Sequence, residues 1–388
     1  MNGTVHTSNM AALQRSFSAA RSQVCVLRSL QSCKQQYRDQ RWVKPFALQQ
    51  RGYKAAVCHK LKSPMEVQDL PPVGKLPKGM VKVAVHSAGI NFADILMVAG
   101  AYQERPELPF VPGFEMAGDI MAVGEGVTAF KEGDRVVGMP TPSGSYAEEC
   151  LVNEKTLFHL PDSVAYTTAA AVPVSYGTAL MGLTRRANLQ PGETVLVTAA
   201  AGALGTAVVD LSAHALGATH TNNFSVHVTP PPAGSREKCE FVVSRGAQHT
   251  IDYSQDSIRD RVKEITQGRG CDVALDAVGG KVFEDSLKSL AWEGRILVAG
   301  FAGGDIPKIP ANILLVKNIS ASGLYFGKYA IKNIGVLRQM VKDSLALMEE
   351  GKIKGPPQPT TFKLEQVNEA FKFIMDRKST GKVVLEVR

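Results

Sequence analysis

The sequence predicts an α/β protein in which a doubly wound parallel sheet is joined to a smaller, mostly antiparallel β-barrel domain. Between residues 193 and 299, short apolar runs alternate with helical patterns, which favours a parallel sheet covered by helices on both faces. Before residue 161, strand-like runs are separated by Gly and Pro instead, as in antiparallel barrels. A chain of 388 residues is long enough for two such domains.

Residues 1–51 differ in composition from the rest of the chain. They contain eight Lys or Arg residues and one acidic residue, and they are rich in Ser, Ala and Gln. Leu13, Phe17 and Val24 can share one face of a helix, which is typical of a mitochondrial transit peptide. We therefore expect a transit peptide and a location in the mitochondrial matrix, with a disordered basic tail as the alternative.

The rest of the chain gives no sign of a nucleic-acid or membrane partner. The formal net charge of +8 resides almost entirely in residues 1–51, so the remainder is nearly neutral and we expect no nucleic acid to bind. No apolar run reaches the length of about 18 residues that a membrane span requires.

The antiparallel barrel is predicted from three short patterns. Residues 81–88 alternate Val with other residues, and residues 118–120 and 133–137 are strand-like runs next to glycine. An alanine-rich run at 167–183 then predicts a helix that crosses between the two domains.

The parallel sheet is predicted from strand candidates that are mostly followed by helical patterns. These candidates are residues 195–198, 250–252, 272–276 and 295–299. Residues 312–326 are strand-like again. Amphipathic helices are predicted near 331–350 and 364–375, and KVVLEV forms the last strand.

Residues 193–218 read as strand, tight turn and helix. The turn has small residues at Ala199, Gly202 and Gly205, so its backbone can approach a pyrophosphate, and the following helix offers free amide groups. The pattern indicates a dinucleotide site, although by itself it fits an ordinary strand-to-helix connection equally well.

Residues 219–232 interrupt the expected order of the sheet. Three consecutive prolines at 230–232 cannot lie in a central strand. Residues 224–228 (FSVHV) could supply the second strand, or the segment could have no place in the sheet. The second alternative would favour a non-catalytic nucleotide-binding structural or interaction protein.

The cysteine and histidine spacing does not predict a metal site. The six cysteines contain no CxxC pair, and none lies at a ligand spacing from a histidine. Reduced thiols, mostly buried, are the expected state.

Several stretches together resemble the medium-chain dehydrogenase/reductase superfamily, and within it the zinc-free quinone oxidoreductase branch. They include AGINFADIL (88–96), LPFVPGFEMAG (108–118), FKEGDRVVG (130–138), VLVTAAAGALGTAVV (195–209), CDVALDAVGG (271–280) and GRILVAGFAGG (294–304). The resemblance implies a GroES-like substrate domain at 52–175, an NADP-binding Rossmann domain at 176–315, and a return to the substrate domain at 316–388. Asn91 and Phe114 replace the cysteine and histidine of the zinc-dependent relatives, so no zinc is expected.

The resemblance implies a zinc-independent, NADPH-dependent reductase of a quinone or an α,β-unsaturated carbonyl, acting as a homodimer that pairs through residues 312–326. Asn91, Asp94 and Tyr102 are the catalytic candidates. Asn91 would anchor a carboxamide or carbonyl, and Tyr102 would donate a hydrogen bond to the developing oxyanion. For Asp94, a role in capping the helix that begins there is the alternative.

The resemblance also implies a set of cofactor contacts. These are Thr178, Ala201, Gly202, Ala203, Leu204, Gly205, Ser235, Lys238, Tyr253, Val278, Gly300, Phe301, Tyr325 and Lys382. NADPH is favoured over NADH because no acidic residue lies between Asp210 and Glu237 to repel a 2′-phosphate. For Thr178 the alternative is a hydroxyl bonded to its own helix, and for Arg236 and Lys238 it is a solvated helix face.

Overall fold

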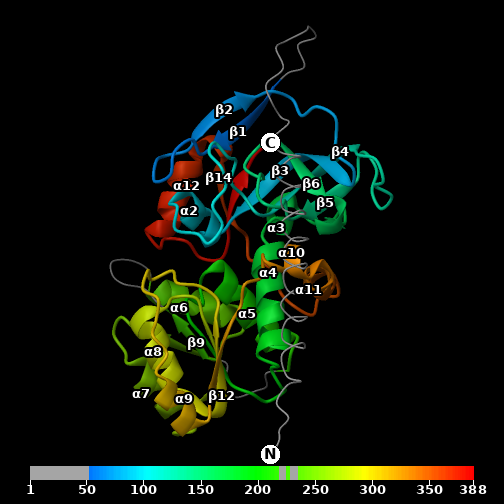
Figure 1. The fold of residues 1–388 in the computed structure, drawn as a ribbon. Helices are drawn as coiled ribbons and strands as arrows, with labels where there is room; N and C mark the ends of the chain where they lie inside the picture. The colour runs from blue at the N-terminus through cyan, green and yellow to red at the C-terminus, as the bar shows by residue number, and fades with distance from the viewer. Residues whose placement is uncertain (1–51, 218–223, 228–234) are drawn as a thin grey trace, which may run out of the picture. The chain divides into compact units, whose positions relative to one another are not determined.

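The structure is a computed structural model that describes residues 52–217, 224–227 and 235–388. The transit peptide prediction, and most of the predictions for residues 219–232, lie outside these ranges. Two sheets dominate the described residues, one of seven strands and one of six (Figure 1).

The seven-stranded sheet is the predicted barrel, and it uses both ends of the chain. Its strand order is β14-β15-β3-β4-β5-β7, with β6 also paired to β3, and every pair is antiparallel except β14 with β15. The strands are β3 (Met80–Ile90), β4 (Met116–Val123), β5 (Arg135–Gly138), β6 (Glu149–Asn153), β7 (Leu157–His159), β14 (Thr360–Lys363) and β15 (Val383–Glu386). Val81, Val83 and Val85 all point into its core, which confirms the predicted alternation.

The six-stranded sheet is wholly parallel and has the order β10-β9-β8-β11-β12-β13. Its strands are β8 (Val195–Val197), β9 (Phe224–His227), β10 (His249–Asp252), β11 (Cys271–Asp276), β12 (Leu290–Val298) and β13 (Ser320–Gly323). The order reverses between β8 and β11, as in a Rossmann fold, and such a reversal creates a crevice at the carboxyl ends of the strands.

Both faces of the parallel sheet are covered, which confirms the doubly wound prediction. Val195 and Val197 pack on one face with α4 (Pro173–Leu180) and α5 (Ala203–His214). Leu196 packs on the other face with α7 (Ile258–Ile265) and α8 (Gly280–Lys288). Successive residues of β8 therefore pack in different hydrophobic cores, which explains why every residue of this strand is apolar.

The second strand of the parallel sheet is formed by Phe224–His227. Its backbone pairs in parallel with β8 on one side and with β10 on the other. This pairing favours the first alternative for the irregular segment and weakens the case for a non-catalytic protein.

One element differs from its prediction. Residues 312–317, expected to be strand-like, belong to α9 (Ala311–Lys317), and only Ser320–Gly323 forms a strand. The apolar run suggested a strand with alternate buried residues, whereas α9 exposes Leu315 and Val316. Pro310 precedes the helix and Asn318 ends it in a left-handed conformation, both of which are helix-boundary features.

The remaining elements complete the chain. They are β1 (Tyr53–Val57), β2 (Glu66–Leu70), α2 (Phe92–Val98), η1 (Glu154–Thr156), α3 (Tyr166–Ala169), η2 (Met181–Arg186), α6 (Ser235–Ser244), α10 (Tyr329–Lys332), α11 (Ile334–Glu349), η3 (Leu364–Gln366) and α12 (Val367–Met375). The run at 167–183 is helical as predicted, through α3, α4 and η2, and α11 and α12 confirm the predicted amphipathic helices. Among the described residues, no helix has both the length and the apolar character to cross a membrane.

Candidate functional site

The turn between β8 and α5 has the geometry of a phosphate-binding turn. Gly202 precedes α5, and no side chain caps the helix. A Cβ on Gly205 would lie 2.4 Å from the Ala199 carbonyl oxygen, so only glycine fits there. The predicted cofactor residues 201–205 therefore surround a helix N-terminus whose amide groups are available to an anion.

The carboxyl-terminal segment lies directly against this turn. The Gly381 amide donates to the Ala201 carbonyl over 2.7 Å, and Gly381 forms a bridge with Gly202. Lys382 follows at once, so the backbone carries this lysine from the glycine-rich turn toward the barrel.

A buried polar network holds Lys382 and Asn91 together. The Lys382 ammonium donates to Asn91 Oδ1 over 2.6 Å and is also paired with Glu115. The Asn91 amide donates to Glu115 Oε1 over 2.9 Å, and the Val174 backbone amide donates to Glu115 Oε2 over 2.8 Å. Glu115 and Lys382 are buried, so the network fixes the Asn91 side chain. Glu115 was not among the predicted site residues.

Asp94 caps the start of α2, which is the alternative role that the sequence predicted for it. Its carboxylate accepts the Asn91 backbone amide at the start of α2 over 2.8 Å, and it also accepts the Gly113 amide over 3.1 Å. Burial raises the pKa of Asp94 to about 7, against the opposing effects of the Asn91 amide, Tyr146 and Lys382. Tyr146 lies beside Asp94 without a hydrogen bond of standard geometry.

Replacing Asp94 with Asn should remove a pH dependence from the stability of the protein. The folded state keeps a proton on Asp94 that the unfolded chain releases near pH 4. Asp94 therefore lowers the free energy of unfolding as the pH rises from about 4 to about 7, by about 4 kcal/mol in total.

Denaturant unfolding at several pH values between about 4.5 and 7.5 measures this effect. The wild type should lose stability relative to Asp94→Asn as the pH rises. The exposed Glu132→Gln variant is the control and should run parallel to the wild type. Parallel curves for wild type and Asp94→Asn would show that Asp94 titrates normally in the folded protein.

A second polar network marks the switch point of the parallel sheet. The Thr198 hydroxyl donates to buried Asp276 over 2.8 Å, which joins the ends of β8 and β11. The Gly303 amide donates to the Val278 carbonyl over 2.9 Å, so the loops after β11 and β12 are joined as well. Val278, Gly300 and Phe301, predicted as cofactor contacts, thus lie in the loops that follow these two strands. Asp276 was missed, since its strand pattern gave no functional signal.

The predicted phosphate-binding residues divide into two groups. The Lys238 ammonium is buried and donates to the Arg377 carbonyl over 2.5 Å, whereas Arg236 is exposed and pairs with Glu240. Burial lowers the pKa of Lys238, and nearby Arg377 lowers it further. The alternative of a solvated helix face therefore holds for Arg236 but not for Lys238.

Tyr253 and Arg377 complete this corner of the site. Burial raises the pKa of Tyr253, and the Arg377 charge opposes the rise. The Tyr253 hydroxyl is buried and has no hydrogen-bond partner among the described residues. An orphaned hydroxyl near Arg377, whose carbonyl also holds Lys238, fits a phosphate-bearing ligand. Arg377 lies in no recognisable pattern, so the sequence gave no reason to select it.

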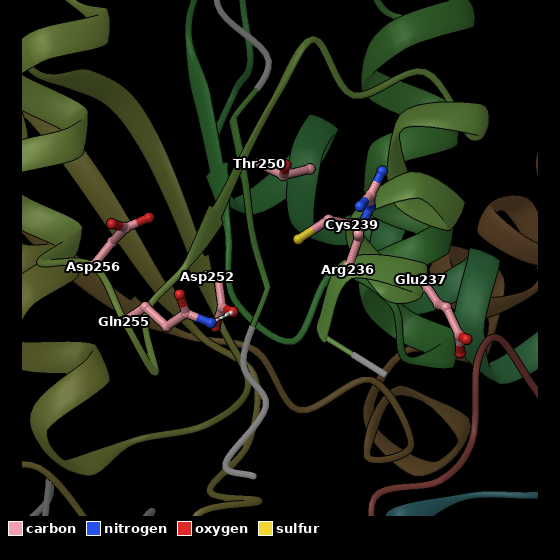
Figure 2. A pocket seen from close by; sticks show the side chains of 7 residues that line it. All are labelled: Arg236, Glu237, Cys239, Thr250, Asp252, Gln255 and Asp256. Atoms are coloured by element: carbon pink, nitrogen blue, oxygen red, sulfur yellow. Dashed lines mark hydrogen bonds between the residues drawn. The ribbon is translucent and has the colours of Figure 1, made fainter. Parts of the chain in front are cut away.

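A neighbouring pocket does not share this character. It has a volume of about 660 Å³ and lies between α6 and the end of β10 (Figure 2). Its lining residues are Arg236, Glu237, Cys239, Thr250, Asp252, Gln255 and Asp256. Because three of them are acidic, this pocket does not suit a phosphate.

The remaining predicted residues occupy two separate positions. Thr178 lies in α4, and none of the described residues accepts a hydrogen bond from its hydroxyl, unlike Ser175 and Thr184, which donate to carbonyls four residues earlier. Tyr102 and Tyr325 pack against each other, with ring centroids 6.2 Å apart. No group of three or more His, Cys, Asp or Glu side chains in the described ranges could hold a metal ion.

The two sheets and the glycine-rich turn that faces Lys382 and Asn91 define a two-domain, dinucleotide-binding oxidoreductase fold. The comparisons agree with this class. Residues 77–162 match the family described as alcohol dehydrogenase GroES-like domain, and residues 245–385 match the family described as zinc-binding dehydrogenase. The chain belongs to the medium-chain dehydrogenase/reductase superfamily.

Individual relatives place it more narrowly. It is 49% identical over 338 residues to the quinone oxidoreductase-like protein 2 homolog of Nematostella vectensis, which covers 87% of this chain and 90% of that protein. Quinone oxidoreductase-like protein 2 of Rattus norvegicus is 49% identical over 340 residues, covering 88% and 94%.

Solved structures agree. The quinone oxidoreductase of Pseudomonas syringae has a TM-score of 0.77 at 31% identity and covers 86% of this chain and 100% of that one. The Escherichia coli quinone oxidoreductase complexed with NADPH has a TM-score of 0.76 at 25% identity and covers 87% and 99%.

Proposed function

We propose that this protein is a zinc-independent, NADPH-dependent reductase that transfers hydride to a quinone or an α,β-unsaturated carbonyl. The observation that carries the proposal is the contact of Gly381 and Lys382 with both the glycine-rich turn and Asn91. This contact brings a dinucleotide site and a candidate carbonyl site together. The names of the relatives, and the NADPH in the Escherichia coli structure, support the substrate class and the cofactor.

The chain's own residues would position the reactants. A bound reduced nicotinamide would supply the hydride. Amide groups at the start of α5 would hold the pyrophosphate, and Lys238, Tyr253 and Arg377 would bind the 2′-phosphate. Asn91, fixed by Glu115 and Lys382, would anchor a carboxamide or carbonyl group. The Tyr102 hydroxyl would donate to the oxyanion that develops on the substrate.

Two further properties belong to this proposal. Pairing of β13 with a second copy would form a homodimer, which is supported by the position of β13 at the end of its sheet and by the exposed Leu315 and Val316 next to it. A monomer in light scattering would refute this pairing. The composition of residues 1–51 supports the mitochondrial matrix as the location, and a cytosolic protein in cell fractionation would refute it.

The catalytic proposal is tested by following NADPH absorbance with a benzoquinone and with an enone, before and after dialysis against EDTA. We expect turnover with at least one substrate, and we expect chelation to leave it unchanged because Asn91 and Phe114 stand in place of zinc ligands. Activity that disappears on chelation and returns with zinc would contradict the zinc-independent mechanism. Absence of turnover with both substrates would contradict the reductase assignment.

A further inference from the structure

The buried network around Lys382 leaves one of its side chains within reach of a ligand. Glu115 and Lys382 are buried, whereas Asn91 is half-buried. The Lys382 ammonium is already paired with Glu115, and it donates to Asn91 over 2.6 Å. Of the three side chains, Asn91 is therefore the one that a bound molecule can touch.

The charges on either side of Asn91 fix the direction in which its amide group points. Oδ1 lies 2.6 Å from the Lys382 ammonium, and Nδ2 lies 2.9 Å from Glu115 Oε1. The opposite orientation would place an N–H donor against the ammonium and a carbonyl oxygen against the carboxylate, and both contacts would be repulsive. Glu115 is itself held by the Val174 backbone amide over 2.8 Å. The two charged neighbours therefore set the orientation of the Asn91 amide.

This orientation leaves Asn91 with a hydrogen-bond donor to offer. A primary amide has two N–H groups, and only one of the two on Asn91 has an acceptor among the described residues. The Asn91 oxygen already accepts from an ammonium, so a neutral ligand donor would have to compete with a charge-assisted hydrogen bond. Asn91 is therefore suited to a ligand oxygen that accepts, such as a carbonyl oxygen, and poorly suited to an amino group.

The backbone next to Lys382 relates this donor to the glycine-rich turn. The Gly381 amide donates to the Ala201 carbonyl over 2.7 Å, and Gly381 forms a bridge with Gly202, so one lysine side chain separates the turn from Asn91. In NADPH, one ribose separates the pyrophosphate from the nicotinamide. The nicotinamide carboxamide also carries the only carbonyl oxygen of this cofactor. With the pyrophosphate at the start of α5, that oxygen is the matching acceptor for Asn91.

We propose that Asn91 donates to the carboxamide oxygen of the nicotinamide, and that Glu115 and Lys382 are positioning residues that hold the Asn91 amide in its donating orientation. The inference rests on the proposed reductase function and deepens it, since it specifies which group of the cofactor Asn91 binds. It gives Lys382 a role that acts through Asn91 in place of the direct cofactor contact that the resemblance implied. A donor at the carboxamide oxygen restrains rotation of the nicotinamide ring and so orients the face that gives up hydride.

Binding of cofactor analogues to the full-length protein tests this assignment without turnover. Isothermal titration calorimetry compares NADP⁺ with its thionicotinamide analogue, in which sulfur replaces the carboxamide oxygen, and with its acetylpyridine analogue, which keeps the oxygen and lacks the amino group. Because sulfur is a weak acceptor, the thionicotinamide analogue should bind the wild type about three- to tenfold more weakly than NADP⁺, which is the effect of one hydrogen bond. The acetylpyridine analogue should bind within about twofold of NADP⁺.

The Asn91→Ala variant removes the donor and keeps the buried Lys382–Glu115 pair, so it should fold. It should bind NADP⁺ about three- to tenfold more weakly than the wild type and should no longer distinguish oxygen from sulfur. Gln103→Ala is the matched control, since it removes an exposed amide from the loop after α2, and it should behave as the wild type.

A double variant, Glu115→Gln with Lys382→Met, tests the positioning roles. It leaves neither charge beside the Asn91 amide, so the discrimination between oxygen and sulfur should fall to within about twofold. Binding of 2′-phospho-ADP-ribose, which has the pyrophosphate and lacks the nicotinamide, should stay within about twofold of the wild type. If the double variant weakens all four ligands equally, the two residues have only a structural role. If 2′-phospho-ADP-ribose binds more weakly and the discrimination persists, Lys382 contacts the cofactor directly. Either result would contradict the positioning roles.

Three results would overturn the assignment of Asn91 and leave the reductase proposal in place. The first is a wild type that binds NADP⁺ and its thionicotinamide analogue equally. The second is a discrimination between oxygen and sulfur that persists in Asn91→Ala, because another residue would then bind the oxygen. The third is a discrimination against the acetylpyridine analogue that Asn91→Ala abolishes, because Asn91 would then accept from the amino group. A folded wild type that binds none of the four ligands would contradict the proposed cofactor, and the assignment with it.

Discussion

Replacing Lys382 with Met should lower the free energy of unfolding by about 3 to 5 kcal/mol, the usual cost of removing one partner of a buried ion pair. Lys382 is 2% exposed and Glu115 is 0% exposed. Without the ammonium, Glu115 would keep, among the residues that the structure describes, only the Asn91 and Val174 amides as donors. Two amide hydrogen bonds do not compensate for the desolvation of a carboxylate.

Urea unfolding of Lys382→Met, Glu115→Gln and the double variant measures this cost. The double variant removes both charges of this pair, so it should be more stable than the sum of the single effects predicts, by about 2 kcal/mol or more. Lys378→Met is the matched control. Its ammonium is 3.3 Å from Asp376 with the side chain 61% exposed, and its loss should cost less than about 1 kcal/mol. If Lys382→Met is as stable as the Lys378→Met control, the buried Lys382–Glu115 pair does not stabilise the fold.

Replacing Lys238 with Met should weaken NADPH binding about 10- to 100-fold and leave NADH binding nearly unchanged, because hydrogen bonds to charged groups contribute about 1.5 to 3 kcal/mol. Only NADPH carries the 2′-phosphate that the corner formed by Lys238, Tyr253 and Arg377 would bind. Lys238 is held by the Arg377 carbonyl, so it is positioned before a ligand arrives.

Fluorescence titration with both nucleotides measures the selectivity. Arg236→Gln is the control, since Arg236 is solvated and paired with Glu240 on the same helix; its ratio of NADPH to NADH affinity should stay within about threefold of wild type. Arg377→Gln should lower the ratio in the same direction as Lys238→Met. If Lys238→Met keeps the wild-type ratio, the 2′-phosphate does not bind at this corner.

The fold could be predicted from local patterns because the secondary structure of a segment depends mainly on residues within that segment. The alternation of Val81, Val83 and Val85 and the small residues between Ala199 and Gly205 both sit within a few residues. The wrong strand prediction for residues 312–317 also came from a local pattern. A short apolar run does not distinguish a strand from a helix that exposes Leu315.

The site was predicted less completely, because its contacts join distant parts of the chain. Lys382 and Asn91 are 291 residues apart, and Lys238 and Arg377 are 139 apart. The resemblance selected Lys382 and Asn91 individually and gave no sign that Glu115 joins them. Arg377 is placed at the site by the folded structure, and no sequence pattern marks it.

A fluorescence titration of the full-length wild-type protein with NADPH, and with NADH as the control, measures whether this fold binds NADPH selectively. We expect saturable binding of NADPH with an affinity about tenfold or more above that of NADH. A folded protein that binds neither nucleotide, or that binds NADH at least as tightly, would contradict it.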